Sequence, residues 1–565
     1  MKSNTQTSRL LQGAFILSAA AIISKLIGTL QKIPLQNLGG DAVFGIYNTV
    51  YPLYTMLLTV AMLGLPAAIS KFVAEASAGR RDEEGRRILL LSALITGISG
   101  LIIGAITYAG APIIAEWVGN SHVMPALRTS AWGLAVVPVM SAIRGYFQGL
   151  HNMVPTAVSQ IVEQSVRVTV MIVLLLYLTS QGAGAESIAA GALLGSAGGG
   201  AAGLVIMLLY LRRHRRRVKQ EAAAEVAAAE VAAAVESQRV RALDAGHGLG
   251  SKQGFMGIKA GTLLAYGIPV MLGALAMPLI GLVDVFTVPR LLSSDGSEVA
   301  AMAQFGVYNR GLPLVQIITM IATSLSVVFI PALAEAKYKG DMKLIETRCS
   351  LSLRWFWLLG LAASAGLAVL AEPINMALYG DTAGSSTMTW LAFTAVGGTV
   401  SIISAALLQG LGYVRAPALH LLAAALLKAA LNLLLVPQQG ITGAAIAGVA
   451  AHSFAAALNV LLLYRQGHLR LRLADALARP ALLTAGLALA AAAASWGTGA
   501  AATAAGIGGG RTASLAQSLL GVLAGCVVFA VGAVVLRLLS ESELRQLPGI
   551  GPSLADKFKK LRLFP

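Results

Sequence analysis

The chain has 565 residues, of which 56% are apolar, and its mean hydropathy is +0.75. Apolar runs of about 20 residues recur along it, each long enough to cross a hydrocarbon core of roughly 30 Å, which argues against a set of soluble domains. The formal charge of +17 would indicate nucleic-acid binding in a soluble protein. Lys and Arg also collect in the cytoplasmic loops of membrane proteins, so we expect no nucleic-acid partner. The two cysteines, Cys349 and Cys526, predict neither a disulfide framework nor a metal site.

The hydrophobic pattern predicts an all-α polytopic membrane protein with fourteen transmembrane helices. The first apolar run, Leu11 to Leu30, contains Lys25 and is followed by no small-residue cleavage site, so we interpret it as an uncleaved first helix. The predicted spans are 11–31, 43–66, 88–110, 127–149, 155–179, 186–211, 262–286, 303–331, 351–371, 387–410, 416–437, 441–464, 480–498 and 515–538.

The distribution of basic residues predicts the orientation. With the N-terminus inside, the cytoplasmic segments hold 33 of the 42 Lys and Arg residues. The outer loops hold only Lys32, Arg128, Arg290 and Arg511. Because basic residues concentrate on the cytoplasmic side, we expect both termini inside, in a protein of the cytoplasmic membrane.

One ten-residue segment occurs twice. Phe44–Leu53 (FGIYNTVYPL) returns as Phe305–Leu314 (FGVYNRGLPL), with six identities and a shift of 261 residues. Gln148–Leu150 matches Gln409–Leu411 at the same shift. Two matches at one shift predict a duplicated unit of six helices. Since an even number of helices separates the copies, we predict two six-helix lobes related by a pseudo-two-fold axis along the membrane normal.

The duplication predicts five regions. They are the N-terminal lobe 1–211, a cytoplasmic linker 212–258, the C-terminal lobe 259–464, two further helices in 465–540, and a cytoplasmic tail 541–565. The linker starts with a basic cluster that suits the inner leaflet, and its Ala/Glu sequence favours an exposed helix. The Gly-Ile-Gly turn of the tail is similar to half of a helix-hairpin-helix DNA motif. A single copy directly after a membrane helix favours an amphipathic helix on the inner leaflet instead.

Ionisable side chains within the spans carry the main functional signal, because each costs at least ~2.5–3.5 kcal/mol on insertion scales. Arg167 lies twelve residues beyond Pro155, roughly 18 Å deep. The shift of 261 places Lys428 at the equivalent depth, so we predict a water-filled cavity with one such cation from each lobe. Glu163 precedes Arg167 by four residues, the spacing of a helical ion pair. Either the pair neutralises itself, or Arg167 exchanges between Glu163 and an anionic substrate.

Three further cations lie nearer the ends of spans. Lys25 and Arg310 lie in the outer parts of the first and eighth spans, where each either reaches the headgroups or faces the cavity. Asp284 is expected to pair with one of them. Arg310 takes the position of Thr49, so this cation belongs to one lobe only. Arg144, near the cytoplasmic end of its span, is interpreted as an interface anchor or gate residue.

The balance of charge predicts an anionic substrate. Five cations within the spans face two acids, Glu163 and Asp284. Such a cavity suits a phosphate or pyrophosphate headgroup, whereas a cation exporter needs buried carboxylates. His420 and His452 are interpreted as packing residues, with proton transfer as the alternative.

Prolines and glycines predict bends in several spans, at Pro52, Gly64, Pro269, Gly273, Pro278 and Pro313. The bends are either gates for alternating access or static distortions. The chain contains no nucleotide-binding loop and no constellation of nucleophile and base, so we predict a transporter that is not an enzyme and uses no cofactor.

Three parts of the sequence together resemble the polysaccharide-transporter branch of the MOP exporter superfamily, which includes stage V sporulation protein B and the MurJ-like lipid II flippases. They are Ser24–Gly28 with Lys32–Pro34, the two Phe-Gly-x-Tyr-Asn segments, and the run from Arg144 to Glu163. The resemblance covers about residues 8–540. It implies fourteen helices in two lobes around a central cavity, and flipping of an undecaprenyl-pyrophosphate-linked glycan between leaflets.

The resemblance also implies that cations of the first and eighth helices line the cavity. Lys25 stands where the family has the first arginine of a Ser-Arg-x-x-Gly motif, and Gln31-Lys32 replaces an Arg-Asp pair. We therefore predict that the substrate is bound by Lys25, Arg310, Arg167, Lys428 and Lys32, supported by Glu163, Asp284 and Arg144. A coupling ion is left open. The alternatives are a multidrug or cation antiporter of the same superfamily and a non-transporting scaffold of a cell-wall or sporulation complex.

Overall fold

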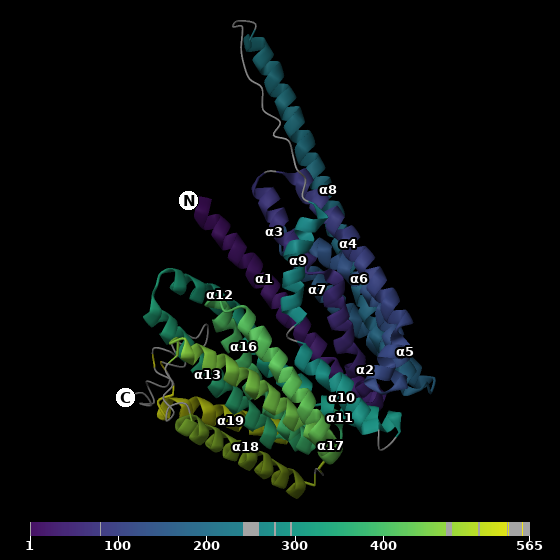
Figure 1. The fold of residues 1–565 in the computed structure, drawn as a ribbon, viewed down its shortest axis with the longest axis vertical. Coiled ribbons are helices and arrows are strands. Elements are labelled where there is room, and N and C mark those ends of the chain that lie inside the picture. The colour runs from purple at the N-terminus through teal and green to yellow at the C-terminus, as the bar shows by residue number, and fades with distance from the viewer. Residues whose placement is uncertain are drawn as a thin grey trace.

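The computed structural model describes residues 2–79, 81–240, 259–275, 278–293, 297–469, 477–506, 509–538, 541 and 556. Every regular element in this described part is helical, as predicted (Figure 1). The elements up to residue 240, here called the first half, are α1 (Lys2–Leu30), α2 (Lys32–Met62), α3 (Leu65–Ala78), α4 (Asp82–Ala109), α5 (Ala111–Val118), η1 (Ser121–Val123), α6 (Met124–Gly149), α7 (Val154–Ser180) and α8 (Ala185–Val240).

The second half comprises the elements from residue 259 to residue 465. They are α9 (Ala260–Leu275), α10 (Leu279–Ser293), α11 (Glu298–Asn309), α12 (Leu312–Tyr338), α13 (Met342–Val369), α14 (Ala371–Tyr379), α15 (Ser385–Ala392), α16 (Thr394–Gly410) and α17 (Arg415–Arg465). Two more helices, α18 (Arg479–Ala504) and α19 (Arg511–Val535), pack against each other and against α13 and α14.

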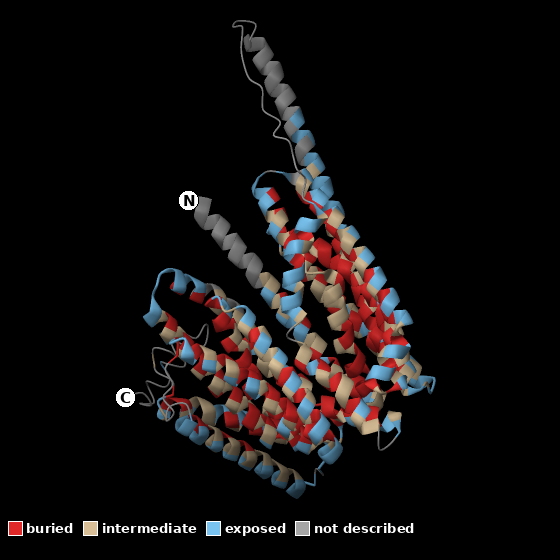
Figure 2. Ribbon diagram, in the orientation of Figure 1, coloured by how far each residue is buried: buried red, intermediate tan, exposed pale blue. Residues whose placement is uncertain are grey.

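The helices form a multi-pass membrane bundle. Among the described residues, ten helices are long and apolar enough to cross a membrane, or up to eleven if the bent pair α9 and α10 counts as one span. Leu94, Leu101 and Ile106 on α4 are more than half exposed, as are Leu489 and Trp496 on α18. Figure 2 shows exposed residues along the outer sides of these helices. Such apolar surfaces are unfavourable in water and suit contact with lipid.

The long helix α17 is a hairpin. Its His420 Nδ1 lies 2.7 Å from Asn459 Oδ1, although 39 residues separate them. The reversal occurs at Gly440, whose backbone has φ +57° and ψ −138°. This conformation is accessible to glycine and strained for other residues. The hairpin therefore holds two antiparallel segments of about a membrane thickness each.

A second reversal follows α1. Gly40 has φ +80° and ψ 174° inside α2. The Gln31 side-chain amide donates to the Tyr47 hydroxyl at 3.3 Å, across a separation of sixteen residues. The stretch Ile16–Ala78, which contains a segment apolar enough to cross a membrane, therefore folds back on itself at Gly40.

The two copies of the repeated segment meet where α2 crosses α11. A Cβ on Gly45 would lie 1.9 Å from the Met302 carbonyl oxygen, and one on Gly306 would lie 2.0 Å from the Asp41 carbonyl oxygen. Residues 41 and 302 differ by the same 261 positions as residues 45 and 306. A two-fold axis produces reciprocal contacts of this kind. Both copies keep glycine because no side chain fits between the backbones.

Three of the predicted bends are breaks between helices. Gly64, with φ +65°, separates α2 from α3. α9 and α10 are bent by 54° next to Pro278. Pro313 lies in the first turn of α12, directly after the break between α11 and α12. The other predicted bend residues lie inside continuous helices; they are Pro52, Pro269 and Gly273.

The bent pair α9 and α10 contacts both halves. α9 packs against α3, where a Cβ on Gly64 would lie 2.0 Å from the Gly267 carbonyl oxygen. Lys71 on α3 lies 4.6 Å from the centre of the Tyr266 ring. α10 instead packs against α17. α9, an element of the second half, is thus held against the first half, whereas α10 packs within the second half.

α8 continues through the Ala/Glu segment to Val240 and projects beyond the bundle, consistent with a helical linker (Figure 1). The remainder of the predicted linker, 241–258, lies outside the described residues. The predicted amphipathic tail 541–565 also lies outside them, apart from residues 541 and 556.

Candidate functional site

Two arginines share one glutamate inside the first half. Arg167 Nη2 lies 2.7 Å from Glu163 Oε1, the ion pair that the four-residue spacing predicts. Arg144 Nη2 lies 2.9 Å from Glu163 Oε2, so Arg144 joins the pair. The three side chains are 11–15% exposed. This group, the first-half centre, carries a net charge of +1 in a poorly solvated position.

The surroundings of the first-half centre hold the two arginines in place. Arg167 donates to the Tyr51 hydroxyl at 3.1 Å, and Arg144 donates to Ser159 Oγ at 2.9 Å. α8 packs closely behind them because Gly199 has no side chain; a Cβ there would lie 2.5 Å from the Glu163 carbonyl oxygen. Tyr51 and Ser159 were not predicted as site residues, since hydroxyl groups on helices carry no distinctive sequence signal.

The second half has its own buried charge centre around Asp284. Lys428 Nζ donates to the Asp284 carboxylate at 2.6 Å and to the Ile280 carbonyl at 3.2 Å. Tyr308 donates to the same carboxylate at 2.7 Å, and Asn432 at 3.1 Å. This group, the second-half centre, is electrically neutral. The expectation that Asp284 pairs with Lys25 or Arg310 is wrong, because Lys428 satisfies it.

A cavity of about 160 Å³ adjoins the second-half centre. Its lining includes Asp284, Lys428 and His452 from the second half. Asn48 and Asn309, which are equivalent under the 261-residue shift, also line it. The cavity therefore lies between the halves, close to the crossing of α2 and α11.

Arg310 forms an ion-pair group that joins the halves, here called the outer latch because its two acids fall in predicted outer loops. Its guanidinium donates to both Asp41 oxygens, at 2.6 and 3.0 Å, and to both Asp381 oxygens, at 2.6 and 3.1 Å. The Tyr379 hydroxyl donates to the Arg310 carbonyl at 2.8 Å. The side chain of Arg310 is only 1% exposed. Its hydrogen bond to Asp381, which lies in a loop, lowers the pKa of that carboxyl.

The outer latch contains two acids that the sequence did not single out. Asp41 belongs to the first half, so its bond to Arg310 crosses between halves, while Asp381 lies between α14 and α15. Both fall in predicted outer loops, where a carboxylate is unremarkable. The one available signal was the position of Asp41, three residues before the repeated segment.

The two remaining predicted cavity cations lie on α1 and at the start of α2. Lys25 is exposed, Lys32 is partly buried, and neither forms a side-chain hydrogen bond or ion pair with any described residue. α1 runs between the halves in Figure 1 and packs against α7, where a Cβ on Gly28 would lie 3.0 Å from the Gln164 amide. The predicted cavity cations therefore have different surroundings: Arg167 belongs to the first-half centre, Lys428 to the second-half centre and Arg310 to the outer latch.

The described residues contain no group of three or more His, Cys, Asp or Glu side chains placed to hold a metal ion.

The sequence matches known proteins over most of its length. A family described as polysaccharide biosynthesis protein matches residues 10–230. An uncharacterized membrane protein, YabM of Bacillus subtilis (strain 168), is 30% identical over 444 residues, which cover 79% of this chain and 77% of YabM. The lipid II flippase MurJ of the same organism is 26% identical over 461 residues, which cover 78% of this chain and 80% of MurJ.

The fold is also found among solved structures. A structure of the lipid II flippase MurJ in an inward closed conformation superposes with a TM-score of 0.62 at 13% identity, covering 92% of this chain and 99% of that one. This likeness concerns the fold alone.

Proposed function

This chain is a multi-pass membrane protein that belongs to the polysaccharide biosynthesis protein family of the MOP superfamily, and from that premise we propose that it is a lipid-linked glycan flippase. Its substrate would be an undecaprenyl-pyrophosphate-linked cell-wall precursor, lipid II or a related polysaccharide unit. The protein would move the headgroup from the inner to the outer leaflet by alternating access while the lipid tail stays in the bilayer.

The observation that carries the proposal is the net positive charge of the first-half centre. Arg144 and Arg167 share the single charge of Glu163, and an uncompensated charge in a poorly solvated site is costly. A pyrophosphate near these guanidiniums would compensate it, and arginine suits phosphate oxygens through paired hydrogen bonds. Lys25, exposed on α1 between the halves, supplies a further cation without a partner among the described residues. A cation exporter instead needs buried carboxylates that are not neutralised by cations.

The proposed topology has fourteen spans with both termini in the cytoplasm. The hairpins at Gly40 and Gly440 each divide one long apolar stretch into two crossings. The pairs α9–α10 and α11–α12 would each form one broken span. In this arrangement the outer latch lies on the outer side, and the basic start of the α8 extension lies on the cytoplasmic side.

Alternating access would proceed by rocking of the two halves about the crossing of α2 and α11. The structure has the outer latch closed, which suits loading of a headgroup from the cytoplasmic side. Opening of the latch would then release the headgroup outward. The driving force would be the membrane potential or an ion gradient.

The experiment is transport by the purified protein in liposomes that contain a fluorescent undecaprenyl-pyrophosphate glycan. We expect flipping by the parent protein and at least tenfold slower flipping by Arg167→Gln, because a hydrogen bond to a charged group contributes about 1.5–3 kcal/mol and about 1.4 kcal/mol is tenfold in rate. Lys219→Gln, a cation on the α8 extension, is the matched control. Transport of organic cations without transport of the lipid would instead support the antiporter.

Complementation tests the third hypothesis, that the protein is a non-transporting scaffold. A cell depleted of its lipid II flippase should grow when this chain is expressed. Rescue by the Arg167→Gln and Lys25→Ala variants, at normal membrane levels, would favour the scaffold.

A further inference from the structure

A loop of the first half contacts the start of α11, at the end of the molecule that the proposed topology places on the outer side. Ser121 donates to the Glu298 carboxylate through its backbone N–H at 2.7 Å and through its hydroxyl at 2.5 Å. The Asn120 side chain donates to the Glu298 carbonyl at 2.7 Å. These bonds lower the pKa of the Glu298 carboxyl, with the Ser121 hydroxyl as the largest cause. They join the halves separately from the outer latch.

His122 connects this loop to the body of the first half. Its Nδ1 lies within hydrogen-bond distance of the Glu186 carboxylate, in the first turn of α8. Its backbone N–H donates to Asn120 Oδ1 at 3.1 Å, which orients the same asparagine that reaches Glu298. The contact between His122 and Glu186 therefore sets the position of the residues that hold α11.

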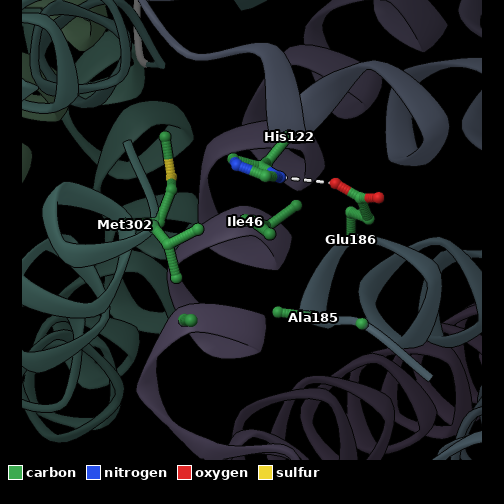
Figure 3. A pocket seen from close by; sticks show the side chains of 8 residues that line it. Ile46, His122, Ala185, Glu186 and Met302 are labelled. Carbon is green, nitrogen blue, oxygen red and sulfur yellow. Dashed lines mark hydrogen bonds and ion pairs between the residues drawn. The ribbon is translucent and has the colours of Figure 1, made fainter. Parts of the chain in front are cut away.

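Both halves surround a cavity of about 200 Å³ beside this contact. Figure 3 shows His122 and Glu186 meeting at one side of it, with Ile46 of α2 and Met302 of α11 nearby. Because the walls are otherwise apolar, the His122–Glu186 contact is its main polar feature. The His122 and Glu186 side chains are 32% and 42% exposed, so protons from the solution on this side, the outer side in the proposed topology, reach them.

The charged groups around His122 are mostly acidic. Glu186 faces it from α8, and Glu298 interacts with it electrostatically from α11. Arg290 of α10, whose aliphatic stem lies against Gly119, is a cation on this side. α5 and α6 also pack against the turn that holds His122, and they carry Glu116 and Arg128. α2 presents apolar residues, Ala42 and Ile46, to the cavity. Of these groups, the Glu186 carboxylate lies within hydrogen-bond distance of the His122 ring.

We propose that Asn120, Ser121, His122, Glu186 and Glu298 form an outer clasp that closes when His122 is protonated and loosens when it is neutral. Histidine is the side chain that changes charge between about pH 5 and 8. A protonated His122 forms an ion pair with Glu186 and attracts Glu298, which holds the loop on α11. Proton concentration on the outer side thereby sets how readily the halves separate there. The proposal does not depend on the identity of the substrate.

The test is a distance measurement across the outer end. Spin labels on Gln181→Cys and Gln438→Cys, both exposed and in opposite halves, report separation in nanodiscs without substrate. A Cys526→Ser background removes the exposed native thiol, while Cys349 is buried. From about pH 5.5 to about pH 8, we expect the closed-to-open ratio to fall roughly two- to fivefold, as for a half-exposed ion pair.

The variants decide whether the clasp is responsible. His122→Gln should abolish the pH response, and Glu298→Gln should lower the closed fraction at both pH values. His151→Asn, a histidine outside the clasp whose backbone φ of +57° asparagine tolerates, is the control and should respond like the parent. A pH response that survives in His122→Gln, or a parent with no response, would overturn the proposal. Because no substrate is present, this outcome is separate from any failure to flip lipid.

Discussion

Gly45 and Gly306, 261 residues apart, lie at a single crossing, each pressed against the backbone of the other's helix. Neither position has room for a Cβ, and the two contacts are reciprocal. The two copies of the repeated segment therefore touch each other across the two halves. Each copy packs its backbone directly against the other.

Substitution at this crossing should be costly. Gly45→Ala or Gly306→Ala would place a methyl group about 2 Å from a carbonyl oxygen, and overpacking of this kind typically costs ~1–3 kcal/mol. We expect a clear drop in the thermal unfolding temperature in detergent for each variant. Gly497→Ala on α18, with open space around the site, is the control and should show no drop. Unchanged unfolding of Gly306→Ala would mean that the halves do not pack in this way.

Because of the outer latch, we expect Arg310 variants to be less stable than the parent protein even without substrate. Removing one partner of a buried ion pair costs ~3–5 kcal/mol, and less here because Asp381 is half exposed. Arg310→Gln should lower the unfolding temperature, and the triple variant Arg310→Gln, Asp41→Asn, Asp381→Asn should recover much of it. If the triple variant is stable but does not flip lipid, Arg310 also acts on the substrate. If the triple variant failed to regain stability, that result would contradict the latch.

The latch also predicts an acid dependence. Hydrogen bonds from Arg310 lower the pKa of Asp381 in the folded protein. A lowered pKa stabilises the fold above the ordinary carboxyl pKa of about 4, and this stabilisation is lost as the pH falls through the lowered value. The unfolding temperature of the parent should therefore fall more steeply below about pH 4 than that of Asp381→Asn. Parallel curves for the two proteins would exclude the contribution of Asp381.

The second-half centre predicts strong coupling between its two charges. Lys428→Met leaves Asp284 buried without a counter-ion, and Asp284→Asn leaves Lys428 in the same condition. Each single variant should be destabilised by ~3–5 kcal/mol, whereas the double variant should lose less than the sum. A double-mutant cycle by thermal unfolding measures the coupling. Additive losses would show that the pair is not coupled.

A substitution at Lys25 can test substrate binding without changing the stability of the fold. It is exposed and has no ion pair with any described residue, so Lys25→Ala should change stability by no more than ~0.5 kcal/mol. If it binds the pyrophosphate, flipping should slow about tenfold or more and Lys25→Arg should restore it. Flipping at the parental rate by Lys25→Ala would remove Lys25 from the substrate path.

Local and periodic features of this protein could be predicted from the sequence alone. The apolar runs identify a membrane protein because span length is set by bilayer thickness. The fixed shift of 261 residues relates Arg167 to Lys428, and the four-residue spacing predicts the pair of Glu163 with Arg167. These are properties of spacing along one chain, so no tertiary structure is needed to recognise them.

Only the tertiary structure decides which of those charges are already neutralised. Arg310 reaches Asp41 across 269 residues, and Lys428 reaches Asp284 across 144. Arg144 shares Glu163 because α6 lies beside α7 and α8. Spacing along the chain does not encode such pairs, since they depend on how whole helices and halves dock. From the sequence, five cations within the spans faced two acids. In the structure these charges form one neutral centre, one centre with a net positive charge and an outer latch with two further acids. Lys25 has no partner among the described residues.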